Sequence, residues 1–296
     1  MNITATMVRD LRETTGCGMM DCKKALAATN GDFDKAIEFL REKGLAAAEK
    51  KAGRIASEGI VSDYVENGVG VVVEVNSETD FVGKNAEFQE FVKAVAKTIA
   101  VNNPADVEAL LTMKIADGEM SVEEVLREKI LKIGENMSIR RFVRYEGNVV
   151  SYIHGGGRIG VLVKVDAELD DDKRNAAKDA AMQIAAINPT YLDKELVPQE
   201  DVEKEKSILI AQIKNDPKSA GKPDAIIEKM VMGRISKFYT LNCLNQQEFV
   251  KDPDTTVEKY LASKGVKVLE FTRFEKGEGL EKKEDNFAEE VASMSK

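Results

Sequence analysis

Hydrophobic residues in the first part of the chain recur at the three- and four-residue spacing of short amphipathic helices. This pattern predicts helices around residues 8–11, 19–26 and 33–40, separated by glycines. Asp32 stands just before the third segment, where its carboxylate can cap the helix. The Ala- and Lys-rich residues 46–57 have high helix propensity and are predicted to form a linker. The chain therefore begins with a small helical module.

The middle of the chain contains one alternating pattern twice. The segment EGIVSDYVENGVGVVVEV at 58–75 aligns with EGNVVSYIHGGGRIGVLVKV at 146–165 if the second copy has two extra residues in its turn. In both copies apolar and polar residues alternate, a turn at glycine follows, and a β-branched strand ends the segment. This is the pattern of a β-hairpin. Because a helical pattern follows each hairpin, at 88–100 and 175–187, we expect two α+β subdomains built to one plan.

The remaining segments add elements to this duplicated core. A helix is predicted at 121–133, and a strand at 137–145 leads into the second hairpin. Two helical patterns within 198–238 are separated by DPKSAGKP, which cannot be helical, so they predict an antiparallel helical hairpin and a candidate dimer contact. A strand at 267–274 is expected to return to the second sheet. The last residues predict a short amphipathic helix that contains Phe287 and needs another surface to hold it.

Composition narrows the function classes. With 43% hydrophobic and 32% charged residues, the chain has the make-up of a soluble globular protein. No apolar run approaches the roughly 20 residues that span a bilayer. The N-terminal sequence is neither a signal peptide nor a transit peptide by pattern, so a cytoplasmic location is expected. A net charge of −9 disfavours nucleic-acid binding, which requires a basic surface, and favours an acidic protein that binds another protein.

Residues that carry most enzyme chemistry are scarce. His154 is the only histidine, and Cys17, Cys22 and Cys243 lack metal-ligand spacing, so we expect buried thiols and neither a metal site nor a catalytic triad. Residues 155–160 fit GxGxxG, but the segment opens a strand instead of a helix and therefore predicts a hairpin turn. We expect no cofactor, no catalytic residue and no enzymatic activity.

The two copies differ where the hairpin ends. Both keep an acidic pair, in which Glu78 corresponds to Glu168 and Asp80 to Asp170. The first copy then has Phe81-Val82 where the second has Asp171-Asp172. A strand-to-helix connection normally lies at the surface and favours polar residues. The Phe-Val pair is therefore either a plug under its own helix or an anchor for another protein. The segment alone leaves both interpretations open.

Two other places are candidate contact surfaces. Met19 and Met20 are adjacent on a helix and cannot both face the same way, so one of them is expected to be available to a partner. The alternative is that both are loosely buried. His154 stands beside the Gly-rich turn of the second hairpin, where an exposed contact residue is expected in preference to a metal ligand.

Three motifs resemble those of the elongation factor Ts family, and the similarity covers essentially the whole chain. They are LRETTGCGMMDCKKAL at 11–26, EVNSETDFV at 74–82, and KIGEN at 132–136 followed by IRR at 139–141. The resemblance implies an α+β fold: an N-terminal three-helix module like a ubiquitin-associated domain, two similar core subdomains with antiparallel sheets, a protruding helical hairpin and a C-terminal helix. Gly83 departs from the family, which more often has Ala or Ser there, and predicts a looser loop.

The resemblance also implies guanine nucleotide exchange on a GTPase, elongation factor Tu, in its GDP-bound and nucleotide-free forms. In the family, the Asp-Phe of the second motif enters the GTPase near its Mg²⁺ and helps to dislodge the ion. The matching residues here are Asp80 and Phe81, flanked by Thr79 and Val82. The N-terminal module and C-terminal helix of the family hold the GTPase domain, and the second core subdomain contacts another domain of the partner. The partner-binding residues expected from this are Arg12, Met19, Met20, His154 and Phe287.

The expected division of the chain follows the same pattern. The units are a helical module at 1–45, a linker at 46–57, core subdomains at 58–140 and at 141–197 with 239–275, the helical hairpin at 198–238 and a C-terminal helical module at 276–296. Two other function classes remain open: an adaptor or translation-associated scaffold that binds without exchange, and a nucleotide-dependent enzyme. The release of GDP from the partner distinguishes them.

Overall fold

The duplicated pattern folds as two sheets of the same topology, and the computed structural model describes residues 3–217 and 222–282. Each sheet has three antiparallel strands, with the second strand of its hairpin in the middle. The first sheet consists of β1 (Glu58–Glu66), β2 (Val69–Ser77) and β3 (Met137–Glu146). The second consists of β4 (Asn148–His154), β5 (Ile159–Val165) and β8 (Val268–Glu275). The expected α+β class with antiparallel sheets is confirmed.

The third strand of each sheet arrives after a long helical connection. β3 pairs with β2 from Met137 to Glu146, so the expected boundary between residues 140 and 141 falls inside a strand of the first sheet. The alternating pattern marks β3 as a strand but carries no information about which neighbour it pairs with. In the second sheet, β8 pairs with β5, as expected. Both pairs have a register irregularity at equivalent places, Glu74/Val75 and Lys164/Val165, so the duplication extends to this bend.

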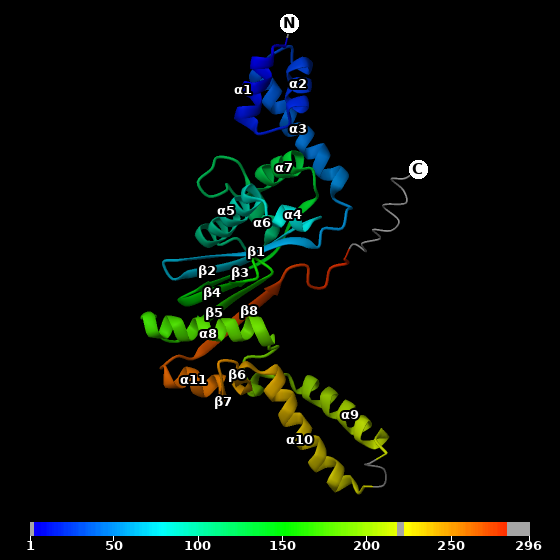
Figure 1. Cartoon of the computed structure of the whole chain (residues 1–296), viewed down its shortest axis with the longest axis vertical. Coiled ribbons are helices and arrows are strands. Elements are labelled where there is room, and N and C mark those ends of the chain that lie inside the picture. Colours follow the sequence, from blue (N-terminus) through cyan, green and yellow to red (C-terminus); the bar gives the residue numbers. More distant parts are fainter. Residues whose placement is uncertain (1–2, 218–221, 283–296) are drawn as a thin grey trace.

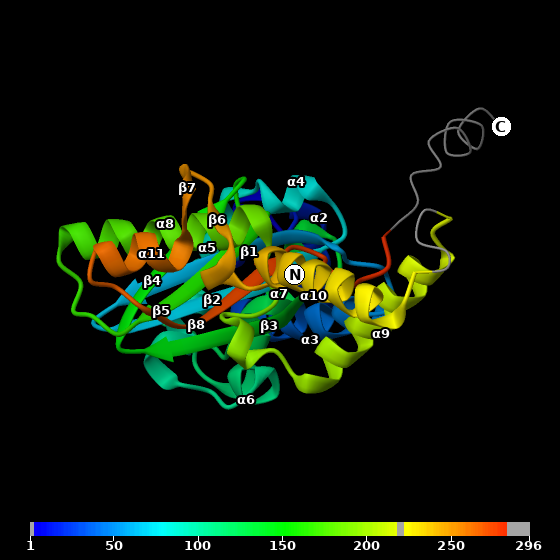
Figure 2. The same ribbon diagram turned by 90° about the horizontal axis from the view of Figure 1, so that it is seen from below.

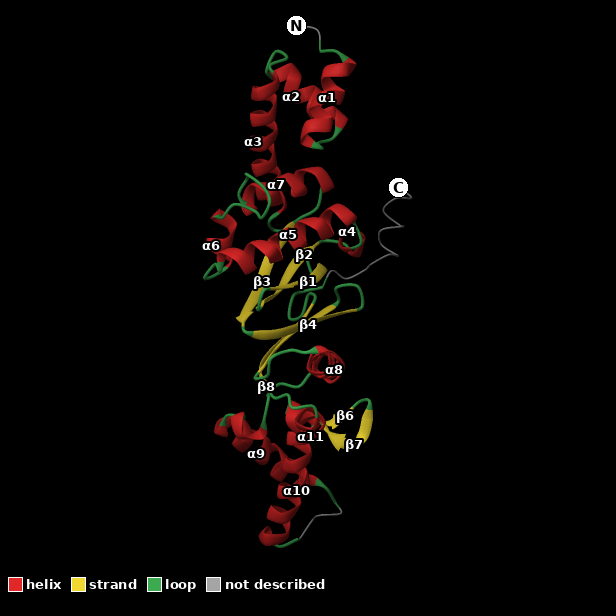
Figure 3. Cartoon of the chain, turned by 90° about the vertical axis from the view of Figure 1, so that its left-hand side faces the viewer, coloured by secondary structure: helices red, strands yellow, loops and turns green. Residues whose placement is uncertain are grey.

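The two sheets lie face to face between two helical layers (Figures 1 and 3). Helix α5 (Ala86–Asn102) covers the outer face of the first sheet, and α8 (Asp171–Ile187) covers that of the second. Seen from below, α10 (Asp224–Asn242) and α11 (Val257–Ser263) lie in front of the sheets (Figure 2). The other elements of this region are α6 (Val107–Thr112), α7 (Val122–Ile133), α11 (Val257–Ser263), β6 (Glu248–Phe249), β7 (Asp252–Thr256) and the 3₁₀ turns Lys194–Leu196 and Leu244–Gln246.

Both covering helices end in the same way. Asn103 after α5 and Asn188 after α8 have left-handed backbone conformations, with φ of 48° and 53°. Asparagine tolerates this conformation, and its N–H donates to the carbonyl four residues earlier, Ile99 and Ile184 respectively. Each asparagine precedes a proline, which stops the helix. The repeat therefore extends beyond the hairpins and through the whole covering helix.

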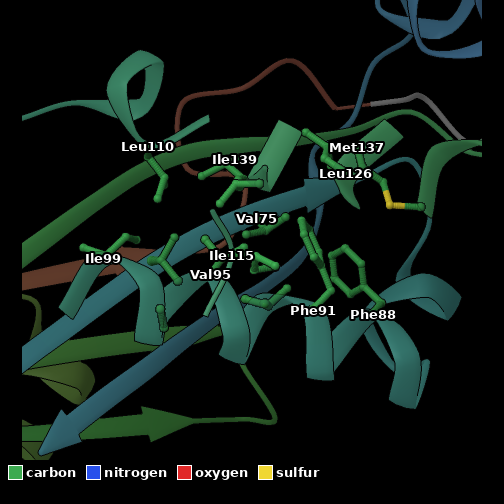
Figure 4. Close-up of a cluster of buried hydrophobic side chains, with 14 of the residues drawn as sticks. Val75, Phe88, Phe91, Val95, Ile99, Leu110, Ile115, Leu126, Met137 and Ile139 are labelled. Atoms are coloured by element: carbon green, nitrogen blue, oxygen red, sulfur yellow. The ribbon is translucent and has the colours of Figure 1, made fainter. Parts of the chain in front are cut away.

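The first core lies between α5 and the first sheet. Phe88 and Phe91 of α5 gather with Val75 of β2 in one cluster (Figure 4). Val71, Val73 and Val75 of β2 are fully buried on this side, while Val72 faces the second sheet. Because both faces of β2 are covered, its sequence is an almost continuous run of valines and lacks the polar alternation of an exposed strand.

A smaller apolar cluster holds the two sheets together. Val61 and Val72 of the first sheet pack there against Val149 and Leu162 of the second, and Phe274 completes the cluster. The repeated glycines, at 70 and 160, lie at this interface. A Cβ at Gly160 would collide with Val61, and one at Gly70 would lie 2.8 Å from Leu162 Cδ1. The glycine identities in the repeat therefore reflect the close approach of the sheets.

The N-terminal module consists of α1 (Ala5–Thr15), α2 (Met19–Ala28) and α3 (Phe33–Lys51) around a core of its own. Asp32 caps α3, as expected, by accepting the N–H of Lys35 at 3.1 Å. The third helix is longer than the pattern predicts, because the first residues of the expected linker continue it without a break. Its end lies along α7, and Ala48 packs against the first core. Packing against α7 turns much of the linker into a part of the fold.

The predicted helical hairpin is formed by α9 (Gln199–Asn215) and α10 (Asp224–Asn242), which protrude from the end of the molecule opposite the N-terminal module (Figure 1). Leu209 and Ile213 of α9 pack against Ile227, Val231 and Ile235 of α10. Helix α10 continues beyond residue 238, where the hairpin was expected to end. The predicted C-terminal helix, with Phe287, lies outside the described residues.

One fully buried carboxylate ties the chain after β8 to the first sheet. Glu74 of β2 accepts hydrogen bonds from Arg140 Nη1 at 3.1 Å, from Arg141 Nε at 2.6 Å and from the N–H of Gly277 at 2.7 Å. The Arg141 guanidinium also stacks 4.3 Å from the centroid of the Phe274 ring. Burial alone would raise the pKa of Glu74, but the hydrogen bonds from Gly277, Arg141 and Asn76 outweigh it, and the pKa is lowered.

Replacing Glu74 tests this connection. Glu74→Gln is expected to lower the free energy of unfolding by about 2–4 kcal/mol at pH 7, because both arginines lose their counter-charge. The folded-state pKa of Glu74 lies below its ordinary value of 4.5, so its stabilising contribution is complete above that pH and is lost as the pH falls through the folded value. The difference between wild type and variant in urea unfolding should therefore shrink from pH 7 towards pH 3. A difference that does not change with pH would contradict this assignment.

Candidate partner-binding site

The Phe-Val pair that distinguishes the first copy lies in a four-residue helix, α4 (Asp80–Gly83), between β2 and α5. The two side chains have opposite environments. Phe81 is 77% exposed, whereas Val82 is 4% exposed and belongs to the first core. Each of the two interpretations of the pair therefore holds for one residue: Val82 is the plug, and Phe81 is an aromatic ring presented to solvent.

Hydrogen bonds fix α4 at both ends. At its start, Glu135 accepts the Thr79 N–H at 2.9 Å and the Thr79 hydroxyl at 2.6 Å. Glu78 in turn accepts the N–H of Asn136 at 2.6 Å. At its end, the Gln89 side-chain amide of α5 donates to the Gly83 carbonyl at 3.0 Å. The exposed ring therefore stands on a turn that is held from two sides and from below.

Gly83 is tightly packed. It is buried, and a Cβ there would lie 2.8 Å from the carbonyl oxygen of Gly59 in β1. The looser loop predicted from the departure at this position is wrong, because the missing side chain is replaced by a close backbone contact. A hollow of about 280 Å³ lies next to it, where α4 meets the glycines of the β4–β5 turn. That turn is bonded to β1 through the Val61 N–H, which donates to Gly157 O at 2.8 Å.

Lys84 lies beside Asp80 and Phe81, which we call the tip of this turn. Lys84 Nζ is 2.6 Å from Asp80 Oδ2 and 5.9 Å from the centroid of the Phe81 ring. The hydrogen bond from Lys84 lowers the pKa of Asp80, so this carboxyl is ionised at neutral pH. The tip presents an aromatic ring and a carboxylate side by side, a combination that can contact both apolar and cationic groups.

The second copy has a different structure at this point. Its covering helix α8 begins directly at Asp171, with Asp170 as N-cap accepting the Lys173 N–H at 2.8 Å. Asp171 and Asp172 are thus in the first turn of α8, where negative charge is favoured by the helix dipole. The extra turn with an exposed ring exists in the first half only.

The methionines of the N-terminal module are both exposed, Met19 to 59% and Met20 to 63%. The sequence predicted that one of them would be available, and the alternative, that both are loosely buried, is wrong. Both are in the first turn of α2, which begins at Met19 after the N-cap Gly18, and the module core is filled by residues further along the helix. Arg12 on α1 is exposed as well. The three cysteines are buried, as expected.

His154 ends β4 and is exposed, and its Nδ1 lies 3.0 Å from the Tyr152 hydroxyl. The structure therefore places the expected contact residues in separate regions. Thr79–Val82 lie in the turn at the first sheet, Arg12 and the methionines lie on the N-terminal module, and His154 lies on the second sheet. Such a spread suits a broad interface with another macromolecule better than a small-molecule pocket.

Comparison with known proteins decides the family. The family model described as elongation factor TS matches residues 78–278. The chain is 54% identical to an elongation factor Ts of Clostridium perfringens (strain SM101 / Type A), with 99% of each chain covered. It is also 54% identical to that of Clostridium kluyveri (strain ATCC 8527 / DSM 555 / NBRC 12016 / NCIMB 10680 / K1), covering 98% of this chain and 97% of the relative. The elongation factor Ts of Clostridium botulinum (strain Alaska E43 / Type E3) is 51% identical, with 99% of each chain covered.

The chain belongs to the elongation factor Ts family. The resemblance of its three motifs is thereby confirmed, and with it a role in the elongation stage of translation. Within 3–217 and 222–282 no helix is long and apolar enough to cross a membrane. The same described residues contain no group of His, Cys, Asp and Glu side chains arranged to hold a metal ion.

Several residues that shape the site of this chain carry no clear signal in the sequence. Glu135 and Asn136 appear in its third motif, but nothing in their spacing shows that they contact Thr79 and Glu78 more than fifty residues away. Gln89 and Lys84 were also missed. The i,i+4 spacing of Asp80 and Lys84 is the one signal that could have revealed a contact in advance.

The opposite environments of Phe81 and Val82 predict opposite effects on stability. Phe81→Ala is expected to change the free energy of unfolding by no more than about 0.5 kcal/mol, because the ring is mostly exposed. Val82→Ala is expected to cost about 1–3 kcal/mol, because it removes buried methyl groups from the first core. Urea unfolding of the two variants measures both values. Equal losses would show that the ring is also part of the packed structure.

Proposed function

We propose that this chain binds elongation factor Tu and accelerates the release of its GDP, with Asp80 and Phe81 displacing the Mg²⁺ of the partner. The observation that carries the proposal is the Phe81 ring, which is 77% exposed on a turn anchored by a buried Val82. An exposed aromatic ring on a rigid support is a good interface anchor, because aromatic residues are enriched among those that carry most of the binding energy.

Disturbing the Mg²⁺ of the partner is an efficient way to loosen its nucleotide. The ion bridges the phosphates to the GTPase, so its loss removes a large part of the attraction that holds GDP. Phe81 would act by occupying space near the ion, and Asp80 by adding a carboxylate beside it. A contact that favours the nucleotide-free partner must, by linkage, weaken when nucleotide rebinds. This chain makes and breaks no bond, so we regard it as an exchange factor and not as an enzyme.

The energy that this action requires is modest. Each tenfold increase in the release rate corresponds to about 1.4 kcal/mol, so several decades need only a few anchored side chains. The exposed Met19 and Met20, together with Arg12 and His154, provide separate contacts that would hold the partner while the tip acts. Methionine suits such a contact because its flexible, polarisable side chain adapts to an apolar surface.

Release of a fluorescent GDP analogue from elongation factor Tu tests the function. The wild-type chain should accelerate release by orders of magnitude, and Phe81→Ala should reduce the rate at saturation roughly 30-fold, the effect of one hot-spot residue. Val101→Ala, which also truncates an exposed apolar residue of the first subdomain, is the matched control and should behave as wild type. Binding without acceleration would instead identify an adaptor.

The methionine contact should affect a different quantity. Met19→Ala combined with Met20→Ala is expected to raise the concentration needed for half-maximal GDP release by about 10-fold or more, with little change in the rate at saturation. Titration of the double variant against a fixed amount of labelled complex gives both values. A lower saturating rate at an unchanged half-saturation point would assign the methionines to the exchange step itself.

A further inference from the structure

The turn that follows α7, Gly134–Asn136, lies against the chain just before α4. Glu135 accepts two hydrogen bonds from Thr79, one from its N–H at 2.9 Å and one from its hydroxyl at 2.6 Å. Both donors belong to the residue that precedes Asp80, so the carboxylate grips the start of the tip from a segment 56 residues away in sequence. Two short bonds to one carboxylate define a direction as well as a distance.

The Thr79 hydroxyl is used in an unusual way. Thr79 is the N-cap of α4, and a threonine at this position normally accepts an N–H from the first turn of its own helix. Here it makes no such cap bond and donates to Glu135. The hydroxyl therefore fixes the position of α4 relative to α7 and β3, and α4 has no side-chain cap at its N-terminus.

A second glutamate makes the reciprocal contact. Glu78 accepts the Asn136 N–H at 2.6 Å and the Arg54 guanidinium at 3.3 Å, and the Asn136 side chain donates to Arg54 O at 2.9 Å. Each of the two segments thus supplies a carboxylate to the backbone of the other. A pair of crossed contacts resists sliding in both directions, which a single bond would not.

We propose that Glu135 is a positioning residue for nucleotide exchange, which fixes through Thr79 the direction in which Phe81 points. This inference rests on the proposed function. Val82 holds the tip from below, and Gln89 holds its end. The Ser77 hydroxyl donates to Thr79 O at 3.0 Å. The restraint that links the start of the tip to the turn after α7 comes from Glu135. Without it, the ring keeps its exposure but loses its orientation. If the Phe81 ring can adopt many orientations, it has the productive one in only a fraction of its encounters with the partner.

The orientation can be measured without any partner. The chain has no tryptophan and six tyrosines, so Phe81→Trp introduces a single tryptophan at the tip, whose fluorescence is excited selectively at wavelengths that tyrosine does not absorb. Its time-resolved anisotropy should show little fast motion in this background and clearly more after Glu135→Ala or Thr79→Val is added. Thr79→Ser keeps the hydroxyl and should restore the restricted motion. Glu168→Ala removes an exposed carboxylate at the equivalent of Glu78 in the second copy and should change nothing.

The effect on exchange should appear in the rate and not in the binding. With Phe81 intact, Glu135→Ala and Thr79→Val are expected to lower the saturating rate of fluorescent GDP release about tenfold, with half-saturation changed less than about threefold. Because both act through one contact, the double variant should be no worse than Glu135→Ala alone. Thr79→Ser should retain most of the wild-type rate.

The outcomes separate the two proposals. If the ring is equally restricted with and without Glu135, or if Glu135→Ala and Thr79→Val both exchange at the wild-type rate, Glu135 is not a positioning residue. If the wild-type chain fails to accelerate GDP release, the proposed function falls, while the anisotropy still shows whether Glu135 orients the ring. Thr79→Val retains the Glu135 carboxylate. It therefore tests whether Glu135 acts through Thr79 even if Glu135→Ala lowers the melting temperature.

Discussion

The pairing of β2 with β3 is the constraint on which the site depends. It places the second motif, at 74–82, beside the third, at 132–141, although α5, α6 and most of α7 lie between them in the chain. At one place along this pair, buried Glu74 meets Arg140 and Arg141 and fixes the segment after β8. At its end, the residues before α4 exchange hydrogen bonds with the turn after α7. Two motifs that look independent in the sequence are two halves of one structural unit.

The two halves share one architecture, and a short local difference before the covering helix gives the first half its tip. Both halves have a hairpin, a covering helix that ends at a left-handed asparagine, and a third strand that pairs with the middle strand of the sheet. The first half inserts the turn α4 before its covering helix, whereas the second proceeds straight into α8. The second half instead carries the helical hairpin between α8 and α11. The shared plan keeps both sheets packed through Val72 and Leu162, while the insertions are free to differ at the surface.

The opposite environments of two adjacent residues suit the action proposed for this short turn. Burial of Val82 fixes the backbone at one point, and Phe81, which is 77% exposed, contributes little to the stability of this fold. Any apolar area that the ring buries is therefore gained only in the complex, where it can favour one state of the partner over another. The contacts proposed on the N-terminal module and the second sheet lie far along the chain from this tip, which suits the proposed separation of partner binding from Mg²⁺ displacement.

Local periodicity in the sequence determined the two hairpins, their covering helices, the helical hairpin and the α+β class, because alternation and helical spacing depend only on neighbouring residues. The Asp32 cap and the turn at the Gly-rich segment follow from the same local chemistry. Only the tertiary structure decided that β3 belongs to the first sheet, that α3 continues along α7, that both Met19 and Met20 are exposed, and that Phe81 faces solvent while Val82 does not. The physical reason is common to all of these. Burial and hydrogen bonding at a residue depend on which distant segment packs against it, and the pattern around Thr79 contains no trace of Glu135.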